Sequence, residues 1–182
     1  MATTNTTRAK KAQTENASAP AQETAKPAKE KPIVPKEINP NQYVTVRNGF
    51  QGTLVYESPR THEIFLWEGF GTEQEMELRE LKNAKNAKKK FFINNWFMFD
   101  EDWIVDYLGV GQYYKHAISI EDFDKIFTMS PSEIKKVLAE MSDGQKKSVM
   151  YRAATLIKDG EIDSRKVITT LEDALGVELI EK

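Results

Sequence analysis

Three aspartates at close spacing are the first feature of this sequence that could do chemistry. Asp100, Asp102 and Asp106 fall within one short stretch. Carboxylates gathered in a cleft can carry out acid–base catalysis or bind Mg²⁺. The same stretch reads as the start of a helix, where acidic side chains favour the positive end of the helix dipole. We therefore interpret these residues as a helix start with solvated carboxylates.

Other patterns with chemical potential lack the partners that their chemistry needs. His62 lies in an expected turn, and His116 has no His or Cys neighbour at metal-ligand spacing. Gly144-Gln145-Lys146-Lys147-Ser148 lacks the strand and upstream glycine of a phosphate loop, and Gly109-Val110-Gly111 is too short for a dinucleotide fingerprint. Without cysteine there is no thiolate nucleophile and no Cys-based zinc site. The sequence predicts a protein that is not an enzyme and binds no cofactor and no metal.

Composition sets the class of protein. The chain has 182 residues, 40% of them hydrophobic and 30% charged, which suits a modest globular core. It contains no apolar run long enough to span a membrane, and residues 1–32 contain no Val, Ile, Leu or aromatic residue. We expect no membrane insertion and no secretion by a visible signal.

The N-terminal segment differs from the rest in charge and in apolar content. Residues 1–36 carry seven bases and three acids, 7 − 3 = +4, whereas the remainder carries 19 − 25 = −6. A segment so poor in large apolar side chains cannot offset the entropy of ordering, so we expect a disordered basic arm. Ile33 and Val34, between two prolines, are predicted to dock on a neighbouring subunit. A solubilising tail is an alternative role for the arm.

Secondary-structure patterns divide the remainder into three parts and predict an α+β fold. Residues 37–78 form a small β module, a curled antiparallel sheet or barrel with a hairpin-type turn at Asn48-Gly49. Residues 79–129 form an aromatic-rich helical segment packed on that module, with a helix closed by Gly109. Residues 130–182 form a three-helix bundle, whose first two helices begin at Ser130-Pro131-Ser132-Glu133 and Ser142-Asp143-Gly144-Gln145.

Two clusters are candidates for binding. The aromatic segment is expected to be mostly core, but Trp96, Phe97 and Phe99 lie in a run without a polar side, so they are predicted to contact a partner. Lys82, Lys85 and Lys89 share one side of an expected helix and could contact nucleic acid. A solvated helix face is the alternative for these lysines.

Three stretches carry a resemblance to known proteins. They are Val46-Arg47-Asn48-Gly49-Phe50-Gln51-Gly52, the run from Phe91 to Leu108, and Gly144 to Ser148. Together, over residues 43–182, they resemble a group of uncharacterised tailed-bacteriophage proteins of the virion or its assembly. The resemblance implies a structural or assembly protein that binds other virion proteins or copies of itself. It also implies a location in the virion, or in the host cytoplasm during assembly. A nucleic-acid-binding or regulatory module is the second hypothesis.

Overall fold

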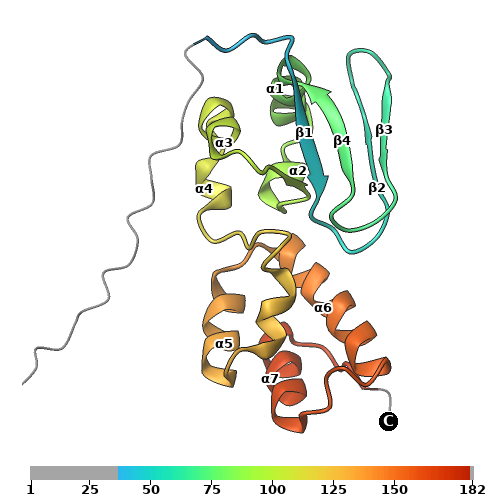
Figure 1. The fold of residues 1–182 in the computed structure, drawn as a ribbon, viewed down its shortest axis with the longest axis vertical. Helices are drawn as coiled ribbons and strands as arrows, with labels where there is room; N and C mark the ends of the chain where they lie inside the picture. The colour runs from blue at the N-terminus through green and yellow to red at the C-terminus, as the bar shows by residue number, and fades with distance from the viewer. Residues whose placement is uncertain (1–36, 181–182) are drawn as a thin grey trace, which may run out of the picture. The chain divides into compact units, whose positions relative to one another are not determined.

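The structure is a computed structural model that describes residues 37–180 (Figure 1). The expected arm, with Ile33 and Val34, lies outside the described residues. Within them, helices accompany small antiparallel sheets, which confirms the α+β class.

The strands form two separate sheets. They are β1 (Tyr43–Asn48), β2 (Leu54–Glu57), β3 (Ile64–Trp67), β4 (Glu73–Glu77) and β5 (Phe97–Met98). A three-stranded sheet has the order β4-β1-β5, and β2 pairs with β3 alone. Val44 and Val46 point into the core at alternate positions of β1, as the period of a strand requires. The indole nitrogen of Trp67 donates to the Val46 carbonyl at 2.8 Å and so ties the two sheets together.

The prediction of a hairpin turn at Asn48-Gly49 is wrong. β1 pairs antiparallel with β4 and β5, not with β2. The buried Asn48 side chain instead holds the following loop, donating to the carbonyls of Gly52 and Gly69 at 2.8 and 2.9 Å. The side-chain oxygen of Asn48 accepts a hydrogen bond from the Phe50 amide at 2.8 Å. These hydrogen bonds use both N–H donors and the oxygen of the side-chain amide, which explains an asparagine at a buried strand end.

Helices from the aromatic segment complete the first core. They are α1 (Leu78–Ala87), α2 (Lys90–Ile93), α3 (Asp102–Leu108) and α4 (Gly111–Tyr114). Their buried residues share one core with Val44, Val46 and Trp67, so the strands have no separate core of their own. α3 ends at Gly109, whose φ of 63° is the left-handed cap expected there.

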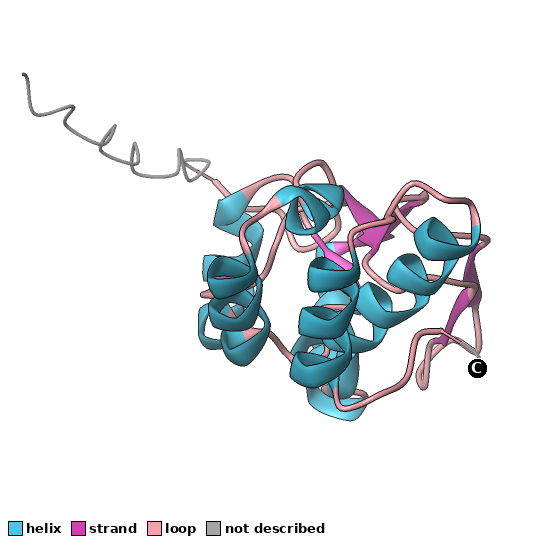
Figure 2. Cartoon of the chain, turned by 90° about the horizontal axis from the view of Figure 1, so that it is seen from below, coloured by secondary structure: helices cyan, strands magenta, loops and turns pink. Residues whose placement is uncertain are grey.

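The second core belongs to the C-terminal helices, α5 (Pro131–Glu140), α6 (Asp143–Lys158) and α7 (Arg165–Leu175). These three helices lie together in the lower part of Figure 1, and in Figure 2 the strands gather on one side of the view. The 3₁₀ helix η1 (Phe123–Thr128) contributes Phe123, Ile126 and Phe127 to this core. The boundary predicted at residue 130 is therefore corrected, because these apolar side chains belong to the second core, although Phe123 also contacts Phe70 of the predicted β module, with ring centres 4.6 Å apart.

Candidate interaction surfaces

Segments far apart in the sequence meet where the two cores adjoin, and we call this contact the joint: residues 48–51, 94–96 and 144–148. The Ser148 hydroxyl donates to the Gly49 carbonyl at 3.0 Å, and the Gly49 amide donates to the Trp96 carbonyl at 2.8 Å. A Cβ at position 144 would lie 2.2 Å from the Asn94 carbonyl oxygen. The joint therefore needs glycine for close backbone approach, and Gly144 to Ser148 is a helix start, as expected from the sequence.

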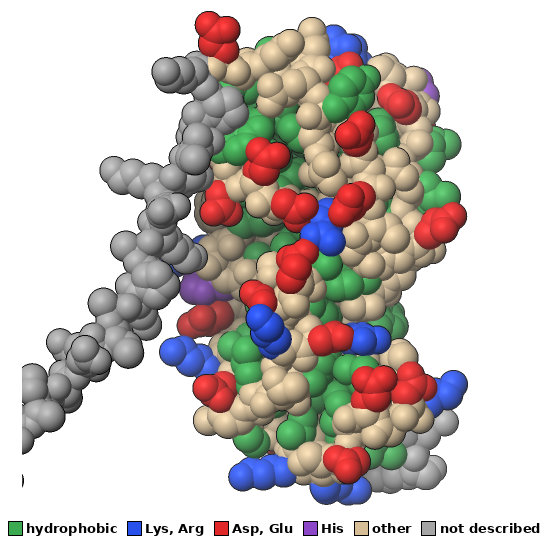
Figure 3. Space-filling model, in the orientation of Figure 1, with side chains coloured by type: hydrophobic (Ala, Val, Ile, Leu, Met, Phe, Trp, Pro, Cys, Tyr) green, Lys and Arg blue, Asp and Glu red, His purple; other side chains and the backbone are tan. Residues whose placement is uncertain are grey.

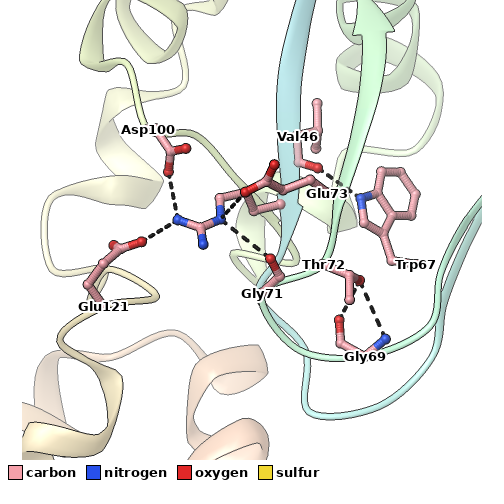
Figure 4. A network of polar contacts seen from close by, with 9 residues as sticks. Val46, Trp67, Gly69, Gly71, Thr72, Glu73, Asp100 and Glu121 are labelled. Atoms are coloured by element: carbon pink, nitrogen blue, oxygen red, sulfur yellow. Dashed lines mark hydrogen bonds and ion pairs between the residues drawn. The ribbon is translucent and has the colours of Figure 1, made fainter.

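Arg47 lies beside the joint and gathers carboxylates from three segments (Figure 4). Its guanidinium contacts Glu73 at 3.4 Å and Asp100 at 3.1 Å, and it also binds Glu121. Partial burial opposes its charge, but the hydrogen bonds to Glu121 and Asp100 raise the pKa of Arg47 above its usual value. The pKa of Glu121 is lowered by a backbone hydrogen bond and by Arg47. This arrangement is an ion-pair network between β1 and the segment before η1.

A groove of about 360 Å³ opens at this network, with walls that include Met98, Phe99, Ile120, Asp100, Asp102 and Glu121. Acidic side chains are prominent on this face of the molecule (Figure 3). Asp100 and Asp102 line the groove, but Asp106 does not, so the structure does not bring the three aspartates together there. In residues 37–180, no group of three or more His, Asp or Glu residues is arranged to hold a metal ion.

The two histidines each pair with a glutamate. His62 Nδ1 lies 3.1 Å from Glu57, and His116 Nδ1 lies 3.1 Å from Glu140. Both histidines are exposed to solvent. The sequence indicated no partner for either histidine, so these carboxylates were not identified from it.

The aromatic candidates have different surroundings. Phe97 is fully buried, between Tyr56, Trp67 and other rings of the first core. The prediction that Phe97 contacts a partner is wrong, because this chain covers it completely. Trp96 and Phe99 are half-buried, so their contact with a partner stays a prediction.

Of the lysine candidates, Lys82 and Lys85 lie on α1, whereas Lys89 lies beyond its end, and all three contact their own chain. The Lys82 ammonium lies 4.2 Å from the centre of the Tyr107 ring, and that of Lys89 lies 5.5 Å from the Tyr113 ring. Lys85 donates to the Leu108 carbonyl at 2.6 Å, at the C-terminal end of α3, where a cation is favourable. Lys82 and Lys85 therefore hold α1 against α3, and Lys89, just after α1, contacts α4.

An apolar face on the β2–β3 hairpin was missed from the sequence. Val55, Ile64 and Leu66 are 51%, 67% and 45% exposed. Val55 stands opposite Leu66, and Ile64 stands opposite Glu57, so all these side chains lie on one face of the sheet. We call Val55, Ile64 and Leu66 the outer hairpin face. The sequence feature that indicates this face is the unbroken apolar run from Ile64 to Trp67. In a strand with one solvated face, apolar and polar residues normally alternate.

None of the helices in the described part of the chain combines the length and apolar content needed to cross a membrane. A scan against protein-family models finds no matching family, and searches of curated proteins and of solved structures find no match.

Proposed function

We propose that this protein is a non-enzymatic assembly protein that binds other proteins through the outer hairpin face. The observation that carries the proposal is the exposure of three aliphatic side chains on one face of a two-stranded sheet. Water-exposed apolar surface of this kind is stabilised when a partner covers it. Trp96, Phe99 and the N-terminal arm, with Ile33 and Val34, provide further proposed contacts.

The setting that we propose is a tailed-bacteriophage virion or its assembly. This part of the proposal depends on the resemblance of residues 43–182 to such proteins. Partners are then other virion proteins or copies of this chain, in the virion or in the host cytoplasm during assembly. Nucleic acid is a weaker candidate, because Lys82, Lys85 and Lys89 already contact α3 and α4.

Mass spectrometry of purified virions tests the proposal. We expect the wild-type chain in particles of the phage that encodes it, and much less of a variant carrying Ile64→Thr and Leu66→Thr. Threonine keeps the strand preference while removing apolar surface. The matched control is Ile93→Thr, which changes an aliphatic side chain that is 42% exposed in α2.

Circular dichroism melts of all variants establish that they fold. Absence of the wild-type chain from particles, or equal incorporation of the double variant, would reject the proposal. A variant lacking residues 1–36 separates the arm from the hairpin, since we expect it to fold but to incorporate poorly.

A further inference from the structure

The β2–β3 sheet has an open edge on the β2 side. The Ser58 amide donates to the Glu63 carbonyl at 2.9 Å, and this pair continues the register of the two strands. Antiparallel pairs alternate between hydrogen-bonded and non-hydrogen-bonded positions. The backbone amide and carbonyl of Tyr56 are therefore hydrogen-bonded to β3, whereas those of Val55 and Glu57 point away from β3.

Side chains cover the outward backbone groups only in part. On the β3 edge, the Gln74 side chain donates to the Leu66 carbonyl at 2.8 Å. On the β2 edge, the Lys88 ammonium donates to the Glu57 carbonyl at 2.7 Å. The amide and carbonyl of Val55 have no hydrogen-bond partner among residues 37–180. An edge with free backbone groups can pair with another strand.

A basic groove runs along this edge. Its volume is about 410 Å³, and it is lined by Val55, Ala87, Lys88, Lys89, Lys90 and Phe91. No acidic residue lines it. Within the described structure, the ammonium groups of Lys89 and Lys90 lie near aromatic rings and form no ion pair with a carboxylate. The groove therefore combines apolar surface with positive charge that its own chain does not neutralise.

The positive charge of the groove indicates which kind of segment can bind at this edge. The chain's own residues 1–36 have a net charge of 7 − 3 = +4, so the lysines would repel them. Pairing of β2 with β2 of a second copy would bring two lysine-lined edges together, which like charges disfavour. An acidic segment of another protein meets neither obstacle.

We propose that the β2 edge binds an extended segment of a partner protein, in which aliphatic and acidic residues alternate, as an added strand. Main-chain hydrogen bonds to Val55 would hold it, as in other cases of strand addition. Its aliphatic side chains would continue the outer hairpin face. Its carboxylates would face the lysines, because Lys88 lies over the Tyr56 ring, on the inner face of the sheet. This inference rests on the proposed function and names the chemistry of the partner.

Solution NMR of the full chain, titrated with a short synthetic peptide of alternating valine and glutamate, tests this proposal. We expect saturable shifts of the Val55, Glu57 and Lys88 amides. Val55→Pro removes an outward amide without breaking the β2–β3 ladder, and should weaken binding by about tenfold, whereas Val55→Ile, which keeps both the amide and an apolar side chain, should not. Lys89→Glu with Lys90→Glu should weaken binding similarly, while Lys82→Glu, away from the groove, should leave it unchanged.

A second measurement leaves the protein untouched, in case Val55→Pro unfolds it. The same peptide with methyl groups on alternate amide nitrogens should lose binding. Equal binding of the methylated peptide, or of a peptide with lysine in place of glutamate, would overturn the proposal. So would a single-stranded oligonucleotide that displaces the peptide with steep salt dependence. Concentration-dependent shifts at Val55 without peptide would assign the edge to a second copy.

The proposed function and the proposed strand addition can be rejected independently of each other. If the peptide does not bind but incorporation into virions still requires Ile64 and Leu66, only strand addition is rejected. If the peptide binds but the wild-type chain is absent from virions, the edge remains a strand-binding site and the virion setting is rejected.

Discussion

The buried carboxylate of Glu80 shows how single polar residues are accommodated in the first core. Glu80 is 5% exposed, and it accepts a hydrogen bond of 2.7 Å from the Tyr56 hydroxyl. Burial, with the neighbouring carboxylate, raises the pKa of Tyr56. The Tyr56 hydroxyl therefore stays protonated at ordinary pH. Its hydrogen bond replaces part of the hydration that Glu80 loses on burial.

Replacing Tyr56 by Phe should lower the free energy of unfolding by about 1–3 kcal/mol, because the buried Glu80 carboxylate loses the nearer of its two donors and keeps only the Asn83 side-chain amide at 3.3 Å. Urea unfolding followed by circular dichroism measures the change. The control is Tyr43→Phe, since the Tyr43 side chain is 63% exposed and its hydroxyl can bond water. Equal effects at the two positions would contradict this account of Glu80.

The ion pair between Arg47 and Glu121 should make stability depend on pH. The pKa of Glu121 is lower when folded, owing to a backbone hydrogen bond and to Arg47. A lowered folded-state pKa adds stability above the unfolded-state pKa, and this stability is lost as pH falls through the folded-state pKa. We expect the Glu121 carboxyl to titrate by NMR below its usual range.

Arg47→Met should move the Glu121 midpoint upward, because it removes the guanidinium. The control is Arg60→Met, which removes an exposed arginine that does not contact Glu121. An unchanged midpoint in Arg47→Met would show that the backbone hydrogen bond alone sets this pKa.

At the scale of elements, helix ends with the same residue type differ in their hydrogen bonds. Ser142, before α6, accepts a hydrogen bond from the Gln145 amide at 3.2 Å. Ser164, before α7, makes no such side-chain bond. Before α5, the Glu133 carboxylate accepts from the Ser130 amide at 2.9 Å. A serine in the sequence thus indicates a helix start, but whether its side chain caps the helix with a hydrogen bond depends on the local geometry.

Ser142→Ala should destabilise the protein by about 1 kcal/mol, because an amide of the first turn of α6 loses its acceptor. Ser164→Ala is the matched control and should have a much smaller effect. Chemical denaturation of both variants measures the difference. A loss at Ser164 as large as that at Ser142 would contradict the assignment of the cap.

At the scale of the whole molecule, the joint decides whether the two cores behave as one unit. Gln145 is 1% exposed, and its side chain bonds the Ile118 amide at 3.2 Å and the Ile118 carbonyl at 2.9 Å. Ser148 bonds the Gly49 carbonyl from the same helix. These buried hydrogen bonds link the start of α6 to the first core and to the chain that precedes η1.

Gly144→Ala should destabilise the protein by about 1–3 kcal/mol, because the added Cβ would overlap the Asn94 backbone and push the joint apart. Calorimetry should show a broader, less cooperative transition than that of the wild type. The control is Gly69→Ala, where an added Cβ meets nothing within 4 Å. A normal, single transition in Gly144→Ala would show that the joint does not couple the cores.

The sequence by itself determined the α+β class, the end of α3 and the starts of α5 and α6, because these depend on local physics. The glycine signal at Gly109 and the serine and proline signals at Ser130-Pro131 and Ser142 act within one turn of the chain.

Only the tertiary structure decided strand partners, the joint and the outer hairpin face. β1 takes β5 as a neighbour across about 50 residues, and such pairing depends on the packing of the whole core, not on a local turn. The same packing places the buried Phe97 beside Tyr56 and Trp67 and leaves Val55, Ile64 and Leu66 uncovered. Apolar residue types look alike in a sequence, and burial separates core from contact surface only once distant segments have met.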